Sequence, residues 1–75
     1  MGIVEDLADD LAKDALDAAH RLEDEKLVDA ISEILGASST TAQEAFLTAT
    51  RVRRAEARAR EFLARKLAKL DEGDA

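Results

Sequence analysis

The apolar residues in the first 35 positions form two helical stripes that do not line up. From residue 4 to residue 22 their spacing alternates between four and three, the pattern of one helix face, in Val4, Ala8, Leu11, Ala15, Ala18 and Leu22. The next positions of this stripe hold Glu25 and Asp29, which are charged. Apolar residues then continue on a second face, roughly half a turn round the helix, which comprises Leu16, Leu27, Ile31 and Ile34.

Two helical arrangements accommodate this change of side. The chain can break near residues 23–26, giving helices over about 3–22 and 26–35. Alternatively, one helix over about 3–35 continues, with at most a kink at 23–26, and buries its two faces against different neighbours. The stretch Glu23-Asp24-Glu25-Lys26 contains no proline or glycine, and glutamate and lysine favour helix. We therefore expect the continuous helix, whose two faces need a partner chain.

A second long helix is predicted over about residues 42–70. It carries a heptad-like seam of mostly small residues, and basic residues gather on roughly the opposite face. The seam consists of Ala45, Ala49, Val52, Glu56, Ala59, Leu63, Leu67 and Leu70. The basic face consists of Arg51, Arg54, Arg58, Arg65 and Lys69.

The connection between the two helices is predicted at about residues 36–41. Gly36 follows an apolar helical run, as expected of the residue just beyond a helix end. Thr41 and Glu44 have the spacing of a capping box at the start of the next helix. So short a connection predicts an antiparallel helical hairpin, and hence an all-α fold with one domain over residues 1–75.

Composition suggests that this hairpin pairs with a second copy. Hydrophobic residues make up 47% of the 75-residue chain, but 16 of them are alanine, which buries little area. There is no cysteine to form a disulfide. We therefore expect a dimeric four-helix bundle, with another helical protein as a further possible partner. The predicted interface comprises Leu16, Leu27, Ile31, Ile34, Phe46, Leu63 and Leu67.

Charge is unevenly distributed along the chain. Residues 1–35 carry a net charge of −8, residues 51–70 carry +6, and the whole chain carries −6. We expect the basic face to pair with an acidic row in the first helix, within or between chains, rather than with nucleic acid, because the acidic molecule as a whole repels phosphate. The row consists of Asp6, Asp10, Asp14 and Asp17, and the predicted counterparts are Lys69, Lys66 and Arg58.

His20 is the one histidine and the main candidate for chemistry. Asp17 and His20 have the carboxylate-x-x-His spacing of di-iron four-helix bundles, and the hairpin places residue 20 level with about Glu56. These three side chains could bind a metal. The alternative is an exposed His20 and a Glu56 paired with Arg53 or Arg60, the spacing of helix salt bridges. We favour this alternative and expect no metal and no cofactor.

The stretch beginning at His20 also resembles a phosphorylation box. His20, Arg21 and Leu22 match its start in one family of sensor histidine kinase dimerisation domains, which are helical hairpins of similar length with an exposed histidine in the first helix. Glu23 and Asp24 stand where lysine and asparagine are usual in that family. The resemblance implies phosphate acceptance at His20 as an alternative function.

The sequence is otherwise poor in catalytic groups. It has one histidine, no cysteine and no tyrosine, and it contains no glycine-rich phosphate loop. Acidic residues interrupt the apolar runs of the first 35 residues, so no membrane segment is expected. We expect a cytoplasmic, non-enzymatic interaction or regulatory module that self-associates.

Overall fold

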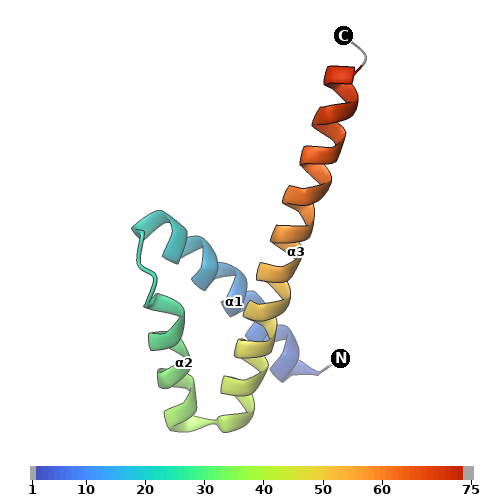
Figure 1. Ribbon diagram of the computed structural model, residues 1–75. Helices are drawn as coiled ribbons and strands as arrows, with labels where there is room; N and C mark the ends of the chain where they lie inside the picture. The colour runs from blue at the N-terminus through green and yellow to red at the C-terminus, as the bar shows by residue number, and fades with distance from the viewer. Residues whose placement is uncertain (1, 74–75) are drawn as a thin grey trace.

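The computed structural model describes residues 2–73, which form three α-helices. These are α1 (Ile3–Leu22), α2 (Leu27–Ser38) and α3 (Thr40–Gly73). Figure 1 shows α1 crossing α3, while α2 turns back beside the first half of α3. The second half of α3 extends beyond both other helices (Figure 1). The predicted all-α class is confirmed, but the hairpin of two long helices is wrong, because the first of them is divided.

The division lies at Glu23, which adopts the left-handed conformation with φ 52° and ψ 42°. The amide of Asp24 donates to the carbonyl of Ala19 at 2.9 Å, and the amide of Glu23 donates to the carbonyl of His20 at 3.3 Å. This pair of bonds is the Schellman arrangement that closes a helix. The Asp24 carboxylate then accepts the amide of Lys26 at 3.0 Å, which supports the turn into α2.

The break explains why the apolar stripe changes side. Because α1 and α2 are separate helices, each turns its own stripe toward α3, and the residues of both contribute to one core. The expected continuous helix over 3–35 is therefore wrong, and the alternative with helices at about 3–22 and 26–35 is close to the observed bounds. The change of side therefore needs no second chain, although Leu22 and Ile34, the last residues of the two stripes, remain exposed.

Glu23 offers a direct test of this turn. A side chain at positive φ is strained by about 1–2 kcal/mol, whereas glycine is not. We expect Glu23→Gly to raise the free energy of unfolding by about 1 kcal/mol. Glu25→Gly, in the same turn but not at positive φ, should lower it by about 0.5–1 kcal/mol. Urea denaturation of both variants measures the difference, and a loss of stability in both would contradict the assigned turn.

The connection between α2 and α3 is the single residue Ser39. Its amide donates to the carbonyl of Leu35 at 2.7 Å, and its hydroxyl accepts the amide of Ala42 at 3.1 Å, so it ends one helix and caps the next. The predicted loop over 36–41 and the cap at Thr41 are wrong, because Ser39 supplies an equivalent hydroxyl two residues earlier. Gly36 is helical, and its lack of a side chain lets the amide of Gln43 lie against it.

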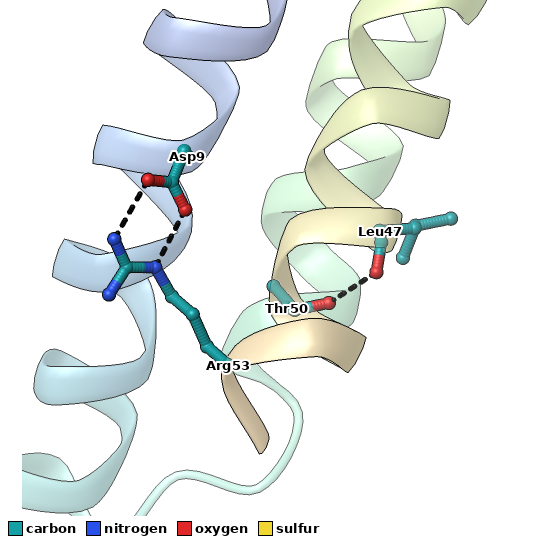
Figure 2. A network of polar contacts seen from close by, with 4 residues as sticks. All are labelled: Asp9, Leu47, Thr50 and Arg53. Atoms are coloured by element: carbon teal, nitrogen blue, oxygen red, sulfur yellow. Dashed lines mark hydrogen bonds and ion pairs between the residues drawn. The ribbon is translucent and has the colours of Figure 1, made fainter. Parts of the chain in front are cut away.

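The core lies where the three helices meet. Phe46 of α3 is the largest fully buried side chain described, and it is surrounded by Val28 of α2 and three small residues of α1, namely Ala8, Ala12 and Ala15. The alanines allow α1 to approach α3 closely. Buried Thr50 satisfies its hydroxyl by donating to the Leu47 carbonyl at 2.8 Å (Figure 2). The core thus contains few large side chains.

Candidate interaction surface

Within residues 2–73, no other segment covers the second half of α3. Every side chain described from Arg54 to Asp71 is exposed, and the helix leaves the three-helix body at about this point (Figure 1). At 1.5 Å per residue, the 34 residues of α3 make a rod of about 50 Å. We call residues 54–73 the free half of α3.

One side of this rod is apolar. At about 100° per residue, the large apolar residues fall in a sector about 140° wide, typical of a buried helix face, and Glu56 is the one acidic residue within it. The large members are between 54% and 62% exposed. The sector, which we call the α3 stripe, consists of Val52, Ala55, Ala59, Phe62, Leu63, Leu67 and Leu70.

Basic side chains border the α3 stripe. By helical position, Arg51 and Lys69 lie at one edge and Arg60 at the other. Lys66 lies within the sector, with its ammonium 5.5 Å from the centre of the Phe62 ring, where it covers part of that apolar surface. The stripe therefore suits a partner that is apolar in the middle and acidic at its margins.

A second exposed apolar surface lies on α1. Ile3 and Leu7, one turn apart, are 74% and 61% exposed. They flank an almost wholly apolar pocket of about 220 Å³, open to solvent, lined by Ile3, Val4, Leu7, Ala8, Leu11, Leu35 and Ala42. The acidic row lies beside it on the outer side of α1, and all four of its members are exposed: Asp6, Asp10, Asp14 and Asp17. We call the pocket and this row the α1 outer face.

One ion pair fixes α1 against α3. The guanidinium of Arg53 donates to both carboxylate oxygens of Asp9, at 2.8 and 2.9 Å (Figure 2). This hydrogen bonding, opposed by desolvation and aided by the charge of Arg53, lowers the pKa of Asp9 below its usual value. The two-point geometry holds the crossing of the two helices in register.

This pair predicts an acid dependence of stability. A carboxyl whose folded pKa is depressed stabilises the fold above its unfolded pKa of about 3.9, and loses that contribution as pH falls through the folded value. We expect Asp9→Asn to lower the melting temperature at pH 7 and to have a smaller effect at pH 2. Asp14→Asn, at an exposed position, is the matched control. Equal effects of Asp9→Asn at both pH values would contradict a role for the ionised pair.

The predicted interface residues fall into two groups. Phe46 is fully buried in the core and is not available to a second chain. Leu16 and Ile31 pack against the same core, and Leu27 is half-buried. The exposed members are Ile34, which is 70% exposed, and Leu63 and Leu67, each 54% exposed.

Sequence reasoning missed several exposed apolar residues. Ile3 and Leu7 lie outside the main stripe of the first helix, and their spacing of four was the available signal. Phe62 lies at the edge of the predicted seam, beside basic positions. Whether a residue of α3 is covered depends on how far α1 and α2 extend along that helix, and no local sequence pattern indicates that extent.

The possible metal site does not assemble in this structure. The Glu56 carboxylate accepts a hydrogen bond from the guanidinium of Arg60 at 2.8 Å, and Asp17 forms an ion pair with Arg21 at 3.6 Å within α1. Within residues 2–73, no group of three or more potential ligands is placed to hold a metal ion. His20 is exposed and lines a shallow hollow beside the α1–α2 turn, together with Arg54. The predicted pairing of Glu56 with Arg60 is confirmed.

The predicted pairing of the acidic row with the basic face is not made within the chain. Among the described residues, the ion pair between helices is that of Asp9 and Arg53, neither of which was named in the prediction. Because α1 crosses α3 instead of running along it, the row does not reach the free half, where Lys66 and Lys69 lie (Figure 1). Pairing between chains stays a prediction.

The chain matches no protein-family model, no curated protein and no solved structure. Within the part of the chain that the structure describes, no helix combines the length and apolar character needed to cross a membrane.

Proposed function

We propose that this protein is a helical interaction module without catalytic activity, which forms a dimer through the free half of α3. The observation that carries this proposal is the α3 stripe. Its four largest side chains, Phe62, Leu63, Leu67 and Leu70, project from a helical segment that the other described residues leave uncovered.

The energetics of helix formation favour packing of the free half of α3 against a partner. Most helical stability in proteins comes from packing of an apolar face against other elements. The free half is attached to the body at one end only. Burying one large apolar side chain contributes about 1.5–3 kcal/mol, so a partner that covers the stripe would stabilise the segment substantially.

The distribution of apolar side chains points the same way. Nine large apolar side chains in the described residues are more than half exposed, whereas the core contains one large aromatic residue and one valine with little exposed surface. Small chains without disulfides commonly make up for a small core by oligomerising. In self-association, a second copy of the same chain covers these exposed side chains, so the partner surface is always present at the same concentration as the side chains themselves.

Hydrogen exchange at two protein concentrations tests the proposal. If a second copy covers the free half, amides of residues 56–70 become more protected as the concentration rises from nanomolar to tens of micromolar. Amides of residues 45–50, in the core half of the same helix, serve as the internal control and should change much less.

Concentration-independent exchange across the whole of α3 would contradict self-association. In that case the stripe would have to be covered by a different helical protein, and the dimer proposal would fail.

A further inference from the structure

We propose that the free half of α3 docks on the α1 outer face of a second copy, and that the second copy returns the same contact. This inference rests on the proposed self-association and specifies which surfaces meet. It commits to α3 on α1 of the partner, in preference to α3 on α3.

The shapes and polarities of the two surfaces are complementary. The α3 stripe presents a raised row of large apolar side chains on an exposed helix. The α1 outer face presents a solvent-open, apolar pocket of about 220 Å³ between α1 and the α2–α3 connection. Pockets of this kind take up single anchoring side chains at protein interfaces. Leu63 and Leu67, one turn apart, match the pair Ile3 and Leu7 in spacing.

Charge complementarity favours this pairing over α3 with α3. Residues 51–70 carry a net charge of +6, so two free halves side by side would bring like charges together. The α1 outer face carries the opposite sign next to its apolar pocket. Docking there sets Lys66, which lies within the stripe, and Lys69, at its edge, near the acidic row, including Asp10 and Asp14.

Because each copy makes the same contact with the other, the assembly is complete as a dimer. Each copy offers one α3 stripe and one α1 outer face, so a two-fold axis lets both contacts form at once and leaves neither surface of the pair open. The result is a dimer with two equivalent contacts. A one-way contact would leave a stripe and a face free at the ends and would produce longer chains.

Charge reversal on each surface tests the pairing. One variant carries Asp10→Lys and Asp14→Lys on α1, and the other carries Lys66→Glu and Lys69→Glu on α3. All four side chains are exposed, so the helices should form in both variants, as circular dichroism would verify. At low salt we expect each variant alone to dimerise about tenfold more weakly than the parent, because both of its contacts bring like charges together.

An equimolar mixture of the two variants distinguishes the possible pairings. In the mixed dimer, both contacts join an acidic surface to a basic one, so affinity should return to about the parent value. If the α1 variant alone dimerises as tightly as the parent, the pairing of α3 with α1 is overturned while self-association stands. If the parent itself does not associate, the proposed function fails and this inference fails with it.

Discussion

Replacing Leu63 and Leu67 together by glutamine is expected to weaken the dimer by a factor of about one hundred or more. Each leucine would lose about 1.5–3 kcal/mol of burial, and every 1.4 kcal/mol changes a dissociation constant tenfold. Glutamine is close in length and favours helix, so the free half keeps its helical propensity. Sedimentation equilibrium of the double variant measures the dissociation constant.

Ala57→Gln with Ala64→Gln is the matched control for this experiment. These alanines are also exposed and belong to the same segment, but they lie on the side of α3 away from the stripe. The control should dimerise nearly as tightly as the parent. Equal weakening by both pairs of substitutions would show that the effect is not specific to the stripe.

Replacing Phe46 by alanine is expected to unfold most of the chain. Removal of a buried phenylalanine costs about 3–5 kcal/mol, and a core of this size rarely supplies more than about that amount in total. Phe46 joins residues of all three helices in one cluster, in which the other buried members are three alanines and one valine. Circular dichroism during thermal denaturation, at a concentration below the dimer dissociation constant, checks this.

Phe62→Ala provides the same chemical change on the exposed half of α3. Phe62 is 56% exposed and Phe46 is fully buried. In the dilute monomer, Phe62→Ala should leave the melting temperature almost unchanged. If the two variants lose similar stability, the assignment of Phe46 to the core and Phe62 to the surface is contradicted.

The sequence predicted the all-helical class, but the expected continuous first helix is divided in two, and the arrangement of the helices was predicted poorly. The stripes of residues 4–22 and of the second long helix gave their extents, because apolar periodicity directly reflects which side of a helix is buried. The shift between Leu22 and Leu27 also signalled the turn. Tertiary packing overrode the helix propensity of residues 23–26, because a left-handed Glu23 lets both α1 and α2 pack on α3.

The weaker predictions were those that needed the angle between helices. An antiparallel hairpin placed Asp17 and His20 level with Glu56, and the acidic row level with the basic face. The crossing of α1 over α3 separates these sets, and the bidentate contact of Asp9 with Arg53 takes their place. A crossing angle depends on how small side chains interlock over a whole interface, here the alanines of α1, and no single spacing in the sequence encodes it.

The candidate surface was partly visible in the sequence. Leu63 and Leu67 belonged to the predicted seam and are exposed, as an interface requires, whereas Phe46 belongs to the core. Both types of residue have the same apolar periodicity. Only the three-dimensional arrangement shows that α1 and α2 cover the first half of α3 and leave the second half uncovered (Figure 1).

Sedimentation equilibrium of the unmodified protein tests the central claim most directly. The chain has a mass of 8.1 kDa, and at micromolar concentration the account predicts twice that mass, falling toward the single-chain value on dilution. A mass of 8.1 kDa at tens of micromolar, with a total helical content by circular dichroism that matches three complete helices, would contradict it.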